Sequence, residues 1–182
     1  MEATLAAARE QLNYAAQLLA QPLELPGPTG ESNKLYLDPR GRLIIVLDDA
    51  AQNDEYLMAV LSALVAGNTV LALADKPLLS SWQLIASSMT DSGLPASAFS
   101  VSPLENWQSV LLSDSISGVM IHAGSVHLHA VAQCIATREG AIIPLISSVS
   151  PRALLRQTLV EKTISIDTTA AGGNASLMTM AS

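Results

Sequence analysis

Three histidines and a single cysteine lie close together in this 182-residue chain. His122, His127 and His129 have side chains that can ligate a metal ion. His127 and His129 are two positions apart in a segment with a helical pattern, so they point in different directions. No acidic residue lies close enough in the sequence to complete a ligand set. We therefore predict histidines at the surface or in the core, and no metal site.

Cys134 is the one side chain of the chain that could form a thiolate nucleophile. It lies among Val131, Ala132 and Ile135, and Arg138 is the closest basic residue apart from the histidines. These neighbours predict a buried, small hydrophobic side chain rather than a reactive one. A single cysteine also excludes an internal disulfide and fits a reducing cytosol.

Acidic side chains follow the first strongly apolar run, which covers residues 43–47. A dinucleotide-binding fold has glycines there, so that the backbone can approach a pyrophosphate. This chain has no glycine at that point, and it places four acids in the next eight positions: Asp48, Asp49, Asp54 and Glu55. Acids at a helix start complement the helix dipole but repel a phosphate. The pattern argues against a bound dinucleotide, and Gly27 and Gly30 are followed by Glu31 rather than by the lysine of a phosphate loop.

Short apolar runs alternate with helical segments through the middle of the chain. The expected strands are residues 43–47, 69–74, 99–101, 119–122 and 142–146. The expected helices are residues 56–65, 80–89, 104–112, 126–138 and 151–160. This alternation predicts an α/β fold with a Rossmann-like, doubly wound, mostly parallel sheet of about five strands. Pro144 indicates that the last strand lies at an edge or contains a bulge.

The remaining segments divide the chain further. We expect an N-terminal helix in residues 1–20, a Pro/Gly linker with a short strand at 34–37 in residues 21–41, the sheet domain in 42–160, and a C-terminal β-flap motif in 161–182. Alternation at 163–169 predicts a half-exposed strand, and 176–180 a second short one. The tail can be a hairpin-like flap that leaves the sheet, a segment that folds onto its own sheet, or a disordered end.

Composition narrows the class of partner. Hydrophobic residues make up 49% of the chain and charged residues 14%, which indicates either a large core or a surface covered by another protein part. A net charge of −7 argues against nucleic acid, which requires a basic face. No apolar run is long enough to span a membrane, and the N-terminus lacks the pattern of a signal peptide. We expect a cytoplasmic protein.

Two stretches resemble the aldehyde dehydrogenase superfamily. Residues 63–71, followed by Lys76 and Pro77, resemble the helix-to-strand passage that leads to a Lys-Pro pair beside the adenosine ribose, although Lys76 comes about three residues late. Residues 121–129 resemble the phosphate-facing turn. Gly124 and Ser125 match that turn, whereas His129 replaces its second glycine and would crowd a pyrophosphate. The strand expected at 142–146 lacks the general-base glutamate that the superfamily carries.

Two other segments carry a closer resemblance. Leu25–Asn33 (LPGPTGESN) and Val160–Met180 (VEKTISIDTTAAGGNASLMTM) are similar to the proline utilization A family, which combines proline dehydrogenase and glutamate-semialdehyde dehydrogenase. The second segment resembles the C-terminal end of that family almost residue for residue. With the sheet similarity between them, the resemblance covers essentially the whole chain.

The resemblance implies a non-catalytic C-terminal domain, with no cofactor or metal of its own. Its terminal motif would form a flap on the aldehyde dehydrogenase module of the same polypeptide and help to close the substrate-channelling passage. The flap residues carried over are Thr168, Thr169, Ala170, Ala171, Gly172, Gly173, Asn174, Ala175, Ser176, Leu177 and Met178. FAD and NAD would belong to the other modules, and homo-oligomer formation stays open. The alternatives are an independent small-molecule-binding domain that uses Gly124 and Ser125, or a degenerate dehydrogenase that still binds NAD.

Overall fold

A five-stranded parallel sheet forms the centre of the body. The computed structural model describes residues 2–147 and 150–168. The strand order is β5-β4-β3-β6-β7, with β3 at Arg42–Leu47, β4 at Thr69–Ala74, β5 at Phe99–Pro103, β6 at Gly118–Met120 and β7 at Leu145–Ile146. The sheet extends from β3 to both sides, so the change of direction falls between β3 and β6. The expected α/β class and parallel sheet are confirmed.

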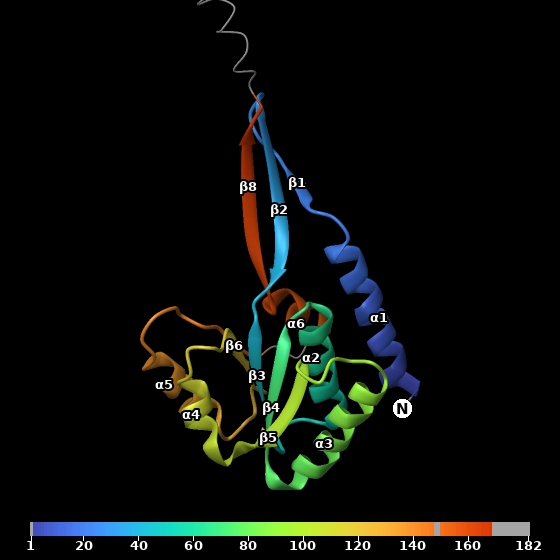
Figure 1. Cartoon of the computed structure of the whole chain (residues 1–182), viewed down its shortest axis with the longest axis vertical. Coiled ribbons are helices and arrows are strands. Elements are labelled where there is room, and N and C mark those ends of the chain that lie inside the picture. The colour runs from blue at the N-terminus through green and yellow to red at the C-terminus, as the bar shows by residue number, and fades with distance from the viewer. Residues whose placement is uncertain (1, 148–149, 169–182) are drawn as a thin grey trace, which may run out of the picture.

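Helices cover both faces of this sheet (Figure 1). Apolar side chains of α2 (Asn53–Val65), α3 (Lys76–Asp91) and α6 (Pro151–Gln157) pack with alternate residues of the strands into one core cluster. The 3₁₀ turn η1 (Leu104–Asn106), α4 (Trp107–Leu111) and α5 (Leu128–Ala136) form a second cluster on the other face. Because the strands are buried on both faces, β3 and β4 have the continuous apolar runs that made them recognisable.

The N-terminal helix α1 (Glu2–Leu19) lies outside α2 and α6. Ala15 is fully buried in a third cluster, against Leu155 and Leu159. Gln11 is also buried, and its Nε2 donates to the Ser62 hydroxyl at 2.8 Å and to the Pro151 carbonyl at 2.7 Å. A polar side chain with both bonds satisfied therefore fixes α1 against α2 and α6.

A narrow β-arm projects from the body (Figure 1). It consists of β1 (Leu23–Leu25), β2 (Glu31–Pro39) and β8 (Leu159–Asp167), which pair antiparallel in the order β1-β2-β8. β2 and β8 pair along nine residues, from Glu31 opposite Asp167 to Pro39 opposite Leu159. Gly30, at a φ of 95°, precedes β2, and its carbonyl accepts from the Thr168 amide at the tip.

The arm corrects two sequence predictions. Most of the expected 21–41 linker is strand, because β8 supplies a partner for all of β2 and β1 pairs on its other side. The helix expected at 151–160 ends at Gln157, because the Thr158 hydroxyl and amide bond back to the Leu155 carbonyl. Leu159 and Val160 then belong to β8.

Smaller boundary differences have local causes. α3 begins four residues before the expected Ser80, since Asp75 occupies its N-cap and Pro77 is tolerated in a first turn. β7 is limited to two residues, after Pro144, and it lies at the sheet edge as Pro144 indicated.

Asn68 joins the base of the arm to the body. Its side chain is buried, its Nδ2 donates to the carbonyls of Ala63 and Thr158 at 3.0 Å each, and its Oδ1 accepts from the Gly41 amide at 3.0 Å. Gly41 has a φ of 125°, and a Cβ there would lie 2.6 Å from the Ser117 hydroxyl. One amide side chain therefore connects the end of α2, the start of β3 and the start of β8.

We predict that Asn68→Ala destabilises the chain by about 2 kcal/mol, because it removes three hydrogen bonds and leaves the Gly41 amide without its acceptor. The carbonyls of Ala63 and Thr158 still accept from the backbone amides of residues 68 and 40. Chemical denaturation should show a lower midpoint with an unchanged m-value. Asn106→Ala, at an exposed position, is the matched control and should change the unfolding free energy by less than about 0.5 kcal/mol. Equal stability of the two variants would contradict the role of Asn68.

Candidate functional site at the carboxyl edge of the sheet

The crevice between the carboxyl ends of β3 and β6 is bridged by Asp48. Its side chain is 1% exposed, and one carboxylate oxygen accepts from the Tyr56 hydroxyl at 2.7 Å and from the Ala50 amide at 3.0 Å. The other oxygen accepts from the Ser125 hydroxyl, which follows β6. Asp48 therefore ties the two strand ends together at the point where a doubly wound sheet usually receives its ligand.

Asp48 remains charged in this position. Burial alone would raise the pKa of its carboxyl group, but the hydrogen bonds from Ser125, Tyr56 and Ala50 outweigh burial and hold that pKa below its ordinary value. Burial and the bond to Asp48 raise the pKa of the Tyr56 phenol, so Tyr56 stays a neutral donor. The crevice thus contains a fixed negative charge, which opposes a pyrophosphate.

The turn after β6 uses its own amides. Gly124 N donates to His122 Nδ1 at 3.0 Å, and Ser125 N donates to the His122 carbonyl at 3.0 Å. His127 N donates to the Ser125 hydroxyl at 3.1 Å, and Leu128 N donates to the Ser125 carbonyl at 3.2 Å. Backbone amides of such a turn would have to face a bound phosphate. Here four of them are already engaged within the turn.

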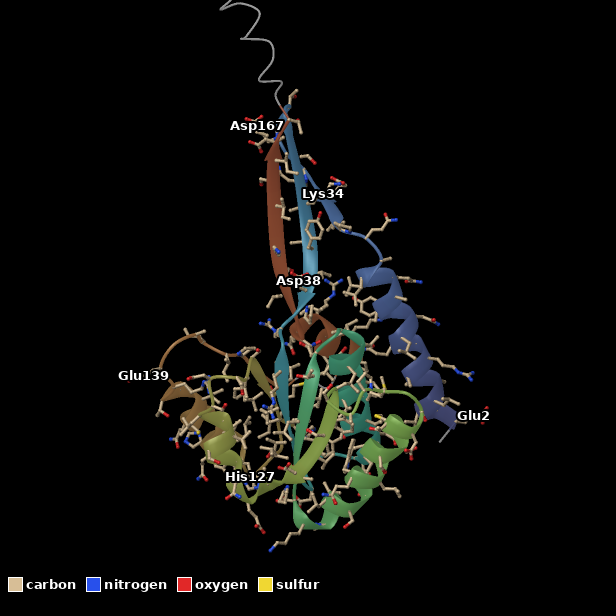
Figure 2. All side chains as sticks on the ribbon, viewed as in Figure 1. Glu2, Lys34, Asp38, His127, Glu139 and Asp167 are labelled. Atoms are coloured by element: carbon tan, nitrogen blue, oxygen red, sulfur yellow. The ribbon has the colours of Figure 1, made fainter. Side chains whose placement is uncertain are left out.

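A cleft of about 400 Å³ opens next to this turn, at the ends of β4 and β5. Its basic side chains face acids: Lys76 Nζ lies 3.0 Å from Glu105 Oε1, and His127 Nε2 lies 4.0 Å from Asp75 Oδ2. Figure 2 shows His127 at the end of the body opposite the arm. Lys76 resembled, in the sequence, the lysine beside the adenosine ribose. In the structure it is exposed and forms an ion pair with Glu105.

The other residues with reactive side chains are dispersed. His129 is exposed on the first turn of α5, so the contact across the crevice comes from Asp48 and Ser125 rather than from His129. Cys134 is half-buried against the second core cluster, and burial raises the pKa of its thiol although Arg138 opposes the shift. In residues 2–147 and 150–168, no group of three or more His, Cys, Asp or Glu could hold a metal ion.

Of the flap residues expected from the sequence, the structure describes Thr168. It follows β8 at the far end of the arm, where Figure 2 shows its neighbour Asp167. The other ten, residues 169–178, lie outside the described part of the chain. Within that described part, no helix is long and apolar enough to cross a bilayer.

Comparison with known proteins relates this architecture to a family. No protein-family model matches the sequence. The bifunctional protein PutA of Escherichia coli is 31% identical over 158 residues, and that of Salmonella typhimurium is 33% identical over 158 residues. Both alignments cover 86% of this chain. The chain is homologous to a segment of PutA. It spans 11% of the length of either relative, so it corresponds to a small part of those proteins.

Solved structures agree with this relationship. A mutant of Bradyrhizobium japonicum PutA superposes with a TM-score of 0.64 at 25% identity, covering 73% of this chain and 14% of that one. An NAD-dependent benzaldehyde dehydrogenase from Corynebacterium glutamicum superposes with a TM-score of 0.64 over 80% of this chain and 33% of its own, at 16% identity. The second likeness establishes the fold alone. The PutA-homologous chain therefore has an aldehyde-dehydrogenase-like fold.

The dinucleotide that this fold suggests does not fit the residues present. The crevice holds a buried carboxylate, and the amides that would face a phosphate donate within their own turn. Sequence reasoning identified the acid but missed its partners, because Ser125 lies 77 positions away. Tyr56, eight residues after Asp48 in the first turn of α2, was a detectable signal.

We predict that Asp48→Asn lowers the free energy of unfolding at pH 7 by about 2–3 kcal/mol, since it removes the charge from three hydrogen bonds. The folded-state pKa of Asp48 is depressed, so its contribution is present above the unfolded value of about 4 and is lost as the pH falls through the folded value.

Urea denaturation between pH 7 and about pH 3 measures this effect, and the difference between wild type and variant should shrink below about pH 4. Asp49→Asn, at the exposed adjacent position, is the control and should leave stability nearly unchanged. A pH-independent difference for Asp48→Asn would contradict the depressed pKa.

Proposed function

We propose that this chain is a non-catalytic C-terminal domain of a bifunctional proline-catabolic oxidoreductase. In this proposal it acts as a lid on the aldehyde dehydrogenase module and closes the passage that carries the intermediate. The observation that carries the proposal is the buried Asp48–Ser125 bond, which occupies the crevice where the dehydrogenase coenzyme would have to bind.

Because Asp48 and Ser125 bridge the crevice in which a coenzyme would bind, a structural role is favoured over a catalytic one. A dehydrogenase needs its coenzyme beside the reacting carbon, and a dehydrogenase of this fold uses the carboxyl edge of the sheet for it. At that edge the Ser125 hydroxyl donates to Asp48. Lys76 forms an ion pair with Glu105, and His127 Nε2 lies 4.0 Å from Asp75 Oδ2. Hydride transfer within this domain would require these contacts to open.

The arm favours docking to another module. It leaves the body near the start of β3, and the crevice lies at the opposite end of the sheet (Figure 1). Within the described residues β8 pairs only with β2, so its outer edge has backbone groups available for a further strand. Ile164 and Ile166 are 37% and 52% exposed on this strand, and contact with another module would remove them from water.

The proposal also assigns the contact made by the tail, the cofactors of the other modules and the compartment of the whole protein. Residues 168–178 contact the aldehyde dehydrogenase module of the same polypeptide, where Gly172 and Gly173 permit a close backbone approach. FAD serves the proline dehydrogenase module and NAD the aldehyde dehydrogenase module. The whole protein works in the cytoplasm.

We expect no saturable NAD binding to the 182-residue chain, because a bound pyrophosphate would face the Asp48 carboxylate. Isothermal titration calorimetry up to millimolar NAD should give only heats of dilution. A dissociation constant in the micromolar range would instead support a degenerate dehydrogenase that still binds its coenzyme, and would remove the basis for a purely structural role.

We expect deletion of Thr168–Ser182 from the full-length enzyme to lower glutamate-semialdehyde oxidation by roughly tenfold or more. The deletion removes apolar side chains whose contacts with the aldehyde dehydrogenase module would each contribute ~1–2 kcal/mol. Proline oxidation should be unchanged. Removal of Ala181 and Ser182 alone leaves the motif complete and is the matched control. Unchanged semialdehyde oxidation after the long deletion would rule out the lid.

A further inference from the structure

A cavity of about 300 Å³ lies on the face of the sheet that α2 and α6 cover. It is enclosed by the first turns of α1, α2 and α6 and by the carboxyl ends of β3, β6 and β7. β3 and β6 are the strands at which the sheet changes direction, and open α/β sheets bind ligands beside the carboxyl ends of such strands. The cavity adjoins the crevice that Asp48 bridges and shares Tyr56 and His122 with it, but neither Asp48 nor Ser125 lines the cavity.

The interior of the cavity is apolar. Its described walls include Ile45, Met58, Met120, Ile146 and Leu154, which belong to the sheet, α2 and α6. α1 contributes small side chains, among them Ala3 and Ala7, and these leave the space open. An apolar cavity of about 150 Å³ is large enough to hold benzene, so this one has room for a ring with a substituent.

One residue of the lining has a side-chain hydrogen-bond donor that no described residue uses. His122 lines the cavity, and its Nδ1 accepts from the Gly124 amide at 3.0 Å. A neutral imidazole that accepts at Nδ1 carries its proton on Nε2. Among the described residues Nε2 has no hydrogen-bond acceptor, whereas Tyr56, which also lines the cavity, already donates to Asp48. The His122 N–H is thus available for an oxygen of a ligand.

The acidic residues at the opening of the cavity determine which kind of ligand oxygen can bind. Asp54 and Glu55 line the cavity and are exposed, so they lie at its opening. Asp54 accepts from the Thr4 hydroxyl at 2.6 Å and Glu55 from the Gln52 amide at 2.9 Å, so both side chains are held in place on the first turn of α2. Two fixed negative charges repel a carboxylate or a phosphate. A hydroxyl or carbonyl oxygen accepts from His122 without this penalty.

We propose that this cavity is a binding site for a small uncharged molecule with an apolar body and one hydroxyl or carbonyl oxygen. The body contacts the aliphatic walls, and the oxygen accepts from His122 Nε2. The proposal does not rest on the tail, because the described lining residues belong to α1, α2, α6, the sheet and the loops that follow β3 and β6.

Benzyl alcohol is the probe, with benzoate as the anion of nearly the same shape. Titration of the ¹⁵N-labelled 182-residue chain, followed by amide chemical shifts, should give saturable changes at residues around the cavity with a Kd of about 1 mM. Benzoate should bind at least tenfold more weakly, because its carboxylate would lie near Asp54 and Glu55.

Two variants locate the site. Ala7→Leu extends into the cavity from α1 and should weaken benzyl alcohol binding by tenfold or more, whereas Ala6→Leu, exposed on the same helix, should not. His122→Asn retains an acceptor for the Gly124 amide but lacks the Nε2 donor, and should weaken binding by about three- to tenfold. Absence of saturable shifts in the wild type, equal binding by Ala7→Leu, or benzoate binding as tight as the alcohol would each overturn the proposal.

Discussion

The hydrogen bonds of the buried Asp48 carboxylate to Tyr56 and Ser125 are the interactions on which the proposed role of this chain depends. A doubly wound sheet separates its strand ends where the winding reverses, and ligands of such folds enter there. In this chain the two strand ends are connected through Asp48, Tyr56 and Ser125. A charge in a place of low dielectric is stable only with such donors around it, so the position is committed to holding the sheet together.

Buried polar side chains join the elements of the body, whereas the arm leaves part of its apolar surface uncovered. In the body, Asn68 and Gln11 make all their bonds to neighbouring elements. On the arm, Leu23 and Ile166 are more than half exposed. A three-stranded ribbon without a covered face gains little from hydrophobic burial. Exposed apolar side chains also lie on the body, among them Ile142, Val126 and Leu84, so the arm is one of several uncovered apolar surfaces.

The parts of the fold that could be predicted from the sequence were those encoded locally. β3 and β4 were found to within a residue, because strands buried on both faces consist of continuous apolar runs. α2 was expected at residues 56–65 and begins three residues earlier, at Asn53, with the same end at Val65. β2 was underestimated, since its nine-residue length depends on β8, which comes late in the chain.

Of the candidate site, only the acidic residues after β3 could be predicted from the sequence. Asp48 was singled out from the sequence as a charge that opposes a pyrophosphate, but its hydrogen bond to Ser125 depends on the pairing of β3 with β6, which no local pattern encodes. His129 was expected to crowd a pyrophosphate, and in the structure it lies exposed on the first turn of α5, which begins at Leu128. The cavity beneath α1 had no signal in the sequence, because it arises from the way that small side chains of one helix meet two others.

The pairing of β2 with β8 has a consequence for how the chain is made. β8 follows β2 by about 120 residues, and the whole sheet is encoded between them. At a synthesis rate of ~10 residues per second, β2 waits on the order of ten seconds for its partner on the ribosome. Loop-closure entropy further favours completing the body before the two strands meet. The arm is thus the last element to assemble, after the segment that forms the body has been made.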